Sequence, residues 1–192
     1  FETAELCTLR KIGSRLQGHP DSKYLPGVEI STGSLGQGLS VACGIALSKK
    51  LDKVPNRVYA VLGDGEQQEG QIWEAAMTGA HYKLDNLCVL VDNNGLQIDG
   101  PVAKVMGVEP IADKWRAFGW DVQDIDGHDM AQIVAALDKA EPVTGKPTAI
   151  VCRTVKGKGS KCFEGKVEFH GTTPSADELA TALKELEEAV CK

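Results

Sequence analysis

The sequence predicts an α/β fold: a parallel sheet with helices on both faces. Short apolar runs bounded by turn residues alternate with longer segments of helical period. The runs are apolar on both sides of the strand, as expected when helices cover both faces of a sheet. With 192 residues, 42% of them hydrophobic, the chain can bury a sizeable core, and we expect a single domain over residues 1–192.

Apolar residues at helical spacing predict helices over residues 3–16 and 35–51, separated by a glycine- and proline-containing loop over residues 17–34. The remaining elements are predicted in alternation: strand 57–62, helix 68–82, strand 87–92, helix 111–118, strand 120–126, helix 130–140 and strand 147–153. A second glycine-rich loop is predicted over residues 154–174. Because ligands of open α/β sheets bind beyond the carboxyl ends of the strands, this second loop is a candidate for the site.

The end of the chain carries the pattern of an amphipathic surface helix. Ser175 and Glu178 have the spacing of a capping box. Apolar residues then recur every three or four positions, at Ala176, Leu179, Leu183, Leu186 and Val190. We expect this stripe to be buried against the rest of the domain.

Charge and cysteine content exclude several classes of protein. There are 21 Lys and Arg against 27 Asp and Glu, a net charge of −6, and no basic block, so a nucleic-acid surface is not expected. No apolar run approaches the ~20 residues needed to cross a bilayer. The cysteines form no C-x-x-C pair, and three of them (Cys43, Cys88 and Cys152) lie in apolar runs, where a thiol behaves as a small hydrophobe. This usage favours a reducing, cytoplasmic location.

A Gly-Asp-Gly motif follows the first predicted strand. Gly63, Asp64 and Gly65 come directly after residues 57–62 and precede a predicted helix. Because glycines carry no side chain, an anionic ligand can approach the backbone here, and a helix start offers unpaired N–H groups. Taken alone, the motif is more often an ordinary turn than a ligand site.

The next predicted strand ends in an Asp-Asn-Asn-Gly sequence that contains Asn94. Neighbouring parallel strands would place Asp64 and Asn94 side by side, although they are 30 positions apart in the chain. Both supply oxygen ligands, and Mg²⁺ is usually shared between a few protein oxygens and substrate phosphates. The pair therefore predicts a divalent-cation site that holds a diphosphate.

Five groups of motifs together resemble the transketolase family of thiamine-diphosphate enzymes. They are Gly18-His19-Pro20, Pro26-Gly27-Val28-Glu29, Thr32-Gly33-Ser34-Leu35-Gly36-Gln37-Gly38, Gly63-Asp64-Gly65 with Gln68-Glu69-Gly70, and Asp92-Asn93-Asn94 with Ile98-Asp99-Gly100. The distance from Gly-Asp-Gly to Asn matches the thiamine-diphosphate signature. The similarity covers nearly the whole chain and is strongest to the N-terminal, diphosphate-binding subunit of transketolases made of two polypeptides.

The resemblance implies a set of site residues. Asp64 and Asn94, through their side chains, and Leu96, through its carbonyl, would bind Mg²⁺, or Ca²⁺ or Mn²⁺ in its place. Contacts to thiamine diphosphate would come from two glycine-containing segments and the loop after the last strand: Gly33, Ser34, Leu35, Gly63, Asp64, Gly65, Glu66, Asn94, Leu96 and Lys156.

The same resemblance implies catalytic roles for three residues. His19 would contact the substrate, His170 would transfer a proton during cleavage of the donor, and Glu69 would lie at a subunit boundary near the cofactor. Three of the residues named have a structural alternative: His19 as a histidine that caps a turn, Glu69 as an exposed helix glutamate, and Lys156 as a solvated loop lysine. His81 and His128 match no such position, and we expect them to be structural.

Members of the family also carry parts that these 192 residues do not contain. One is an upstream segment with a Ser-Lys-Gly-His motif, and we expect the chain to lack it, as a piece of a longer protein or as a shortened subunit. The other is the pyrimidine-binding domain, which a C-terminal partner subunit would supply. We therefore expect activity only with that partner, in a dimer of such pairs.

The resemblance implies an enzyme that moves a two-carbon ketol unit from a ketose phosphate to an aldose, as in the pentose phosphate pathway. Two alternatives stay open. One is another thiamine-diphosphate enzyme component, similar to deoxyxylulose-phosphate synthase or to a 2-oxoacid dehydrogenase. The other is a noncatalytic scaffold that retains the fold.

Overall fold

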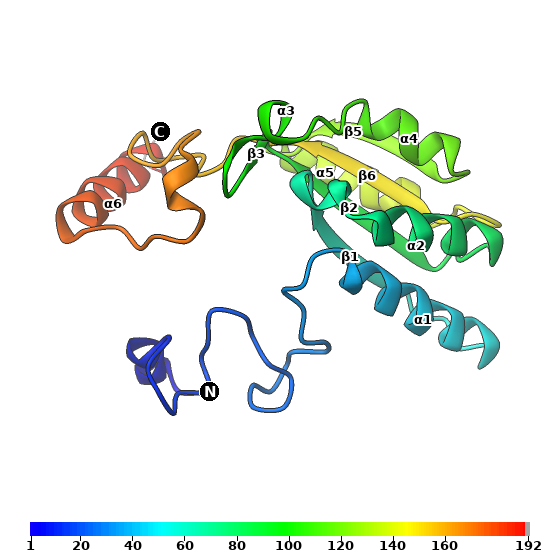
Figure 1. The fold of residues 1–192 in the computed structure, drawn as a ribbon, viewed down its shortest axis with the longest axis horizontal. Helices are drawn as coiled ribbons and strands as arrows, with labels where there is room; N and C mark the ends of the chain where they lie inside the picture. The colour runs from blue at the N-terminus through cyan, green and yellow to red at the C-terminus, as the bar shows by residue number, and fades with distance from the viewer. Residues whose placement is uncertain (191–192) are drawn as a thin grey trace.

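Four parallel strands form the central sheet of the computed structural model, which describes residues 1–190 (Figure 1). In spatial order they are β1 (Val58–Gly63), β2 (Leu87–Asn93), β6 (Thr148–Arg153) and β5 (Asp121–Asp126). All three pairings between neighbours are parallel, so their carboxyl ends lie at one edge of the sheet. The predicted α/β fold is confirmed.

Helices cover both faces of this sheet. The elements involved are α1 (Gln37–Leu51), α2 (Gly70–His81), α4 (Ile111–Ala117) and α5 (Met130–Ala140). Val89 and Val91 of β2 pack with residues of α1, α2 and α4 in the larger core, whereas Cys88 and Ile150 pack with α5 in the smaller one. Alternate residues of one strand thus face opposite helix layers, which explains why the strands are apolar on both sides.

Two helices begin later than the apolar period predicts. α1 begins at Gln37 because Gly36, with a φ of 82°, adopts a left-handed conformation at the N-cap. Ahead of α2, the 3₁₀ helix η2 (Gly65–Gln68) and the extended Glu69 take up the first residues of the predicted helix. Both differences fall where the chain enters the loops that face the carboxyl edge of the sheet.

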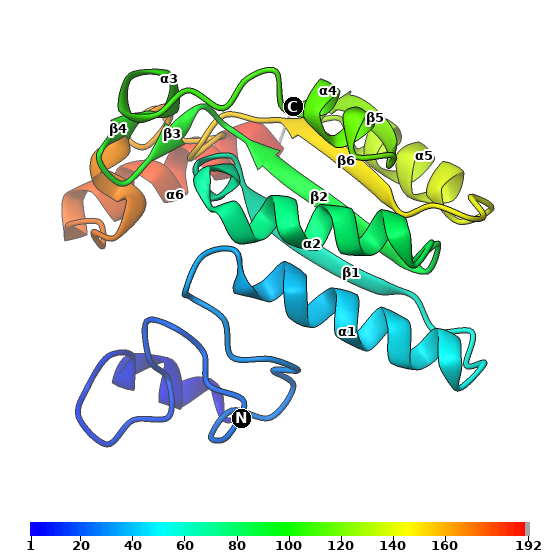
Figure 2. The ribbon, with the colours of Figure 1, turned by 45° about the vertical axis from the view of Figure 1, so that its right-hand side comes forward.

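A small hairpin beyond this edge was not predicted. β3 (Leu96–Gln97) and β4 (Gly100–Pro101) pair antiparallel and are followed by the one-turn helix α3 (Val102–Val105). Figure 2 shows the hairpin beyond the arrowhead of β2. Elements of two to four residues are too short to produce a recognisable hydrophobic period.

The prediction of a helix over residues 3–16 was wrong. Only η1 (Thr3–Thr8), a 3₁₀ helix, forms there, and the chain then turns through Arg10 and Gly13 with φ values of 62° and 81°. Leu6, Leu9 and Ile12 are exposed. The helical spacing had no surface to pack against, and a short helix without tertiary packing is not stable in water.

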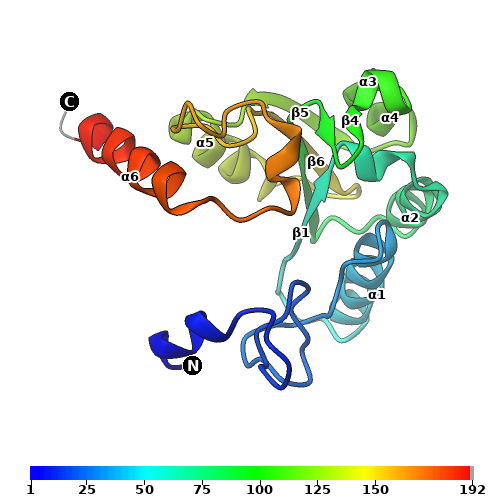
Figure 3. The same ribbon diagram turned by 60° about the vertical axis from the view of Figure 1, so that its left-hand side comes forward.

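The last helix, α6 (Ala176–Val190), forms as predicted, and its stripe does not pack as predicted. The Ser175 hydroxyl accepts from the Glu178 N–H, and the Glu178 carboxylate accepts from Ser175, so the capping box is confirmed. Leu179, Leu183 and Leu186 remain 45 to 51% exposed, because α6 extends away from the sheet (Figure 3). The apolar pattern identified the apolar face of α6 correctly, but this face does not pack against the sheet.

Three cysteines pack in the core as predicted. Cys43, Cys88 and Cys152 are buried with free thiols, and burial raises the pKa of the Cys43 and Cys88 thiols to about 11. These two thiols are therefore protonated near neutral pH and behave as apolar groups. Among residues 1–190, no helix is long and apolar enough to span a bilayer.

Candidate functional site

β1 and β2 end side by side, joined by the crossover helix α2. Gly63 is in register with Asp92, and the Asp64 N–H donates to the Asp92 carbonyl at 3.2 Å. The Gly-Asp-Gly motif and the Asp-Asn-Asn motif thus meet at one edge of the sheet, as their positions after neighbouring strands predict.

Asp64 is held in place by backbone N–H groups from two turns. Its Oδ1 accepts from Gly65 N at 2.7 Å, and its Oδ2 accepts from Gly95 N at 2.5 Å. The side chain is only 2% exposed. Because Gly95 directly follows Asn94, the Asp64 carboxylate lies against the same turn that carries the second predicted ligand.

The amide of Asn94 is fixed at both ends. Its Nδ2 donates to Asp92 Oδ2 at 3.0 Å, and its Oδ1 accepts from Leu96 N at 2.9 Å. These contacts settle which end of the amide is oxygen and leave a second lone pair on Oδ1. The structure therefore places the Asp64 carboxylate against the turn that carries Asn94 and Leu96, the other two predicted cation ligands.

The charge at this turn is uncompensated by protein cations. Burial raises the pKa of Asp64, and the nearby Asp92 charge acts in the same direction, while the bonds from Gly95 and Gly65 oppose it. Among the described residues, no Lys, Arg or His forms an ion pair with Asp64 or Asp92. A buried carboxylate beside a second one, with amide and carbonyl oxygens within the same turn, suits a hard divalent cation.

Glu66 links this turn to the glycine loop before α1. Its Oε1 accepts from Gly36 N at 2.8 Å and its Oε2 from Gly63 N at 3.0 Å. The predicted cofactor contacts Gly33, Ser34 and Leu35 lie on this loop, immediately before Gly36. Thus the two predicted cofactor segments are adjacent, and the Glu66 carboxylate itself is bound to backbone.

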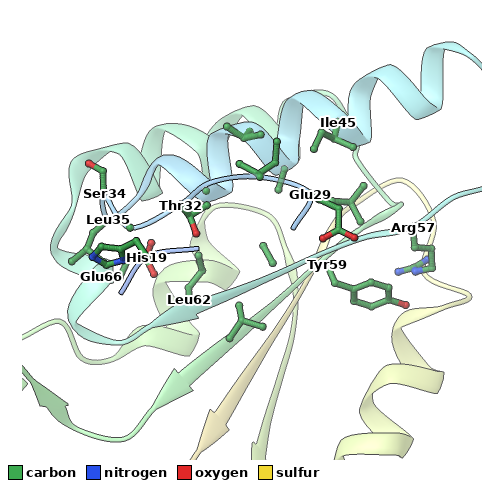
Figure 4. A pocket seen from close by; sticks show the side chains of 18 residues that line it. His19, Glu29, Thr32, Ser34, Leu35, Ile45, Arg57, Tyr59, Leu62 and Glu66 are labelled. Carbon is green, nitrogen blue, oxygen red and sulfur yellow. The ribbon is translucent and has the colours of Figure 1, made fainter. Parts of the chain in front are cut away.

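His19 lies at one end of a hollow beside the glycine loop. The hollow has a volume of about 710 Å³ and runs between the glycine loop, α1 and β1. Figure 4 shows His19, Ser34, Leu35 and Glu66 together at one end, with Arg57 and Tyr59 at the other. The His19 ring packs directly over Gly33, where a Cβ would lie 2.8 Å from Nδ1.

The loop after β6 carries the other two predicted residues. Its first residue, Thr154, donates from its hydroxyl to the Asp92 carboxylate. Lys156 follows, with a half-buried side chain, and its carbonyl accepts from Gly165 N at 2.9 Å. His170 is exposed at the end of the 3₁₀ helix η3 (Val167–His170), which contacts β3. The loop therefore starts at the predicted cation site and returns to the strand that carries Leu96.

Glu69 and the two remaining histidines occupy different environments. Glu69 is exposed, and its Cβ packs close to Gly36. His128 Nε2 accepts from Val155 N at 2.7 Å, a contact that supports the start of the loop after β6. His81 ends α2 and packs edge-on against Tyr82.

Sequence reasoning missed two residues that organise the site. Asp92 accepts from both Asn94 and Thr154, and Gln67 donates to the Gly63 carbonyl while accepting from Trp115. Asp92 could have been singled out by its place in the Asp-Asn-Asn motif. Gln67 gave no signal, because a buried glutamine within a polar turn looks like any solvated side chain.

Fold and site together define a diphosphate-binding domain of the thiamine-diphosphate type. The family model "Transketolase, thiamine diphosphate binding domain" matches residues 1–188. The chain belongs to the transketolase family.

Two similar proteins are named as subunits of transketolases. The chain is 45% identical to the 6-deoxy-6-sulfo-D-fructose transketolase subunit SqwG of a Clostridium species, over 97% of this chain and 68% of that one. It is 43% identical to an apulose-4-phosphate transketolase subunit of Phocaeicola vulgatus, over 96% of this chain and 66% of that one.

The crystal structure of Campylobacter jejuni transketolase matches with a TM-score of 0.90 and 32% identity, over 96% of this chain and 30% of that one. The chain thus spans about two thirds of the related subunits and less than a third of the Campylobacter enzyme.

Proposed function

We propose that the chain is one subunit of a transketolase that depends on thiamine diphosphate and a divalent cation and transfers a two-carbon ketol unit from a ketose phosphate to an aldose. The observation that carries this proposal is the buried Asp64 carboxylate, which is bound to the Asn94–Leu96 turn and lies near Asp92, with neither carboxylate in an ion pair among the described residues. Family membership over residues 1–188 supports it.

The proposed cation is Mg²⁺, with Ca²⁺ or Mn²⁺ as substitutes. Asp64, Asn94 and the Leu96 carbonyl would hold it, and diphosphate oxygens would complete the shell. Once bound, thiamine diphosphate supplies the group that accepts the electron pair released when the donor's carbon–carbon bond breaks. The chain supplies the cation ligands, the glycine turn and the loop over residues 33–35.

We assign three polar side chains to the substrate: His19, which lines the hollow, and His170 and Lys156, which lie on the loop after β6. His19 would bind sugar hydroxyls above Gly33, His170 would move a proton at the donor hydroxyl, and Lys156 would oppose phosphate charge. Glu69 would contact the partner subunit near the cofactor. Its exposed side chain beside Gly36 supports that role.

The proposed partner is a C-terminal subunit with the pyrimidine-binding domain, in a dimer of such pairs. Support comes from relatives whose names call them subunits and from the length ratio to the Campylobacter transketolase. Large apolar side chains at the carboxyl edge, Leu35, Ile98 and Met106, are 54 to 65% exposed, as a surface awaiting a partner would be. We further propose a sugar-phosphate substrate, a place in cytoplasmic carbohydrate metabolism such as the pentose phosphate pathway, and no nucleic-acid or membrane partner.

The deciding experiment mixes the chain with the partner subunit that copurifies with it and measures two-carbon transfer between sugar phosphates, with and without Mg²⁺. We expect transfer only with all components present. Transfer from pyruvate instead would indicate another thiamine-diphosphate enzyme, and cofactor binding without any transfer would indicate a scaffold. Saturation with cofactor at 100 times its dissociation constant should stabilise the complex by about 2.7 kcal/mol, and Asp64→Ala should remove this increment.

A further inference from the structure

One carboxylate fixes the spacing between the two glycine segments of the site. Glu66 uses both of its oxygens for this purpose, Oε1 for Gly36 N and Oε2 for Gly63 N, at 2.8 and 3.0 Å. The two N–H groups lie at opposite ends of one helix–strand unit: Gly36 directly precedes α1, and Gly63 ends β1. With both oxygens engaged, the carboxylate is a brace within the protein.

Glu66 is connected to His19 through the glycine loop over residues 33–36. Gly36, in its left-handed conformation, also packs against Glu69, where a Cβ would lie 3.1 Å from the Glu69 Cβ. Three residues earlier, Gly33 has a φ of 143°, and the His19 ring packs against it, in the space that a Cβ at this position would need. The loop is thus fixed at Gly36 by Glu66, and the position of Gly33 determines where the His19 ring lies.

We propose that Glu66 is a positioning residue that sets the distance between the diphosphate-binding turn at 63–65 and the loop at 33–36, and so places the cofactor's ring system and His19 relative to the diphosphate. This inference rests on the proposed function. A glutamine in its place has one acceptor for two donors, so one N–H would face an NH₂ group and the two segments would separate. Aspartate would be one methylene too short to reach both.

The test compares two probes on the complex of the chain with its partner subunit, both titrated with Mg²⁺ present. Inorganic pyrophosphate occupies only the diphosphate turn, whereas thiamine diphosphate also requires the glycine loop. For Glu66→Gln we expect the affinity for thiamine diphosphate to fall about ten-fold, with the pyrophosphate affinity unchanged. The matched control is Asp85→Asn: the Asp85 carboxylate bridges Lys50 and the Gly145 N–H at the amino ends of the strands. This control should change neither affinity.

Each outcome is decisive. Equal losses of affinity for both probes would mean that Glu66 only supports the fold of the diphosphate turn. No loss for either probe would mean that Glu66 does not determine the distance between the two segments. Both results overturn the inference and leave the proposed function intact. A wild-type complex that binds neither probe overturns both proposals. If Glu66→Gln does not melt cooperatively, Glu66→Asp is measured in its place, with the same selective loss expected.

Discussion

Thr154 donates a hydrogen bond from its hydroxyl to the carboxylate of Asp92, and this contact ties the loop after β6 to the end of β2. The other oxygen of Asp92 accepts from the Asn94 amide. One side chain that was not among the predicted ligands therefore orients a predicted ligand and anchors the loop that carries Lys156 and His170. Residues that orient ligands in this way typically change metal affinity 10- to 100-fold when they are replaced.

For Asp92→Asn we expect Mg²⁺ affinity in the presence of thiamine diphosphate to fall about ten-fold. The substitution removes the negative charge of Asp92 and turns one of its two acceptors into a donor, so the Thr154 hydroxyl has to reverse its hydrogen bond for the Asn94 amide to keep its own. Calorimetric titration of the complex with Mg²⁺ measures the effect. Asp121→Asn, which removes an ion pair with Lys146 at the amino end of β5, is the control, and an equal change in both variants would contradict the prediction.

The ion pair between Asp124 and Arg153 should make stability depend on acid pH. Hydrogen bonds from the Arg153 guanidinium, at 3.0 and 2.9 Å, hold the pKa of Asp124 below its ordinary value of 3.8. A lowered pKa in the folded state stabilises the protein above the ordinary value, and this stabilisation is lost as pH falls through the lower, folded-state value. Because the two side chains are 35 and 48% exposed, we expect only about 0.5–1 kcal/mol.

Unfolding free energies of the wild type and Asp124→Asn, measured from neutral to strongly acid pH, test this expectation. The difference should be largest at neutral pH and should vanish in acid, where the wild-type carboxyl is protonated. A difference that stays constant over the whole range would show that the substitution acts through packing rather than charge.

The meeting of Asp64 with the Asn94 turn was predictable because it depends on local facts. Each motif follows an apolar run of strand length, and one helical segment lies between them, so a parallel crossover leaves little choice of arrangement. The Glu66 brace was not predictable in the same way. Its partners are backbone N–H groups, and the amino-acid sequence does not indicate which of these a side chain will bind.

The two failed predictions have one physical cause. Periodicity at residues 3–16 and in α6 shows which face of a helix could be buried, but not whether this chain supplies the surface. Around residues 3–16 no such surface exists among the described residues, and the helix does not form. α6 forms with its capping box at the first turn and with contacts to the loop at residues 160–161, which bind Glu185, but Leu179 and Leu183 stay exposed.

Gly157 should be the least replaceable glycine of the loop after β6. Its φ is 70°, and a Cβ would lie 2.6 Å from the Phe163 carbonyl oxygen. Gly165 has a nearly identical φ of 67°, with no atom within 4 Å of a Cβ. Gly165→Ala should therefore cost about 1 kcal/mol, from the left-handed backbone alone, and Gly157→Ala about 1–3 kcal/mol more, from the clash. Chemical denaturation of both variants measures the difference, and equal costs would show that the loop relaxes around the new methyl group.

Trp115 connects the core to the turn that carries Asp64. It is fully buried, its ring packs edge-on against Trp120 at 4.6 Å, and its Nε1 donates to Gln67 Oε1 at 3.1 Å. Gln67 in turn donates to the Gly63 carbonyl at 2.9 Å. Trp115→Phe would leave a cavity and a buried amide oxygen without a donor, so we expect a loss of about 2–3 kcal/mol in the free energy of unfolding.

Trp73→Phe is the matched control for this change. Trp73 is half-buried, stacks on Phe118 and donates to the backbone carbonyl of the same Gln67. Because Trp73 is only half-buried, phenylalanine leaves a smaller cavity there, and we expect a cost of about 1–2 kcal/mol, which includes the lost bond to the buried Gln67 carbonyl. Equal losses for the two variants would mean that ring volume, rather than the unpaired Gln67 amide, determines the cost. A larger loss for Trp115→Phe than for Trp73→Phe, together with faster proteolysis at residues 63–68, would show that the core tryptophan holds the site turn through Gln67.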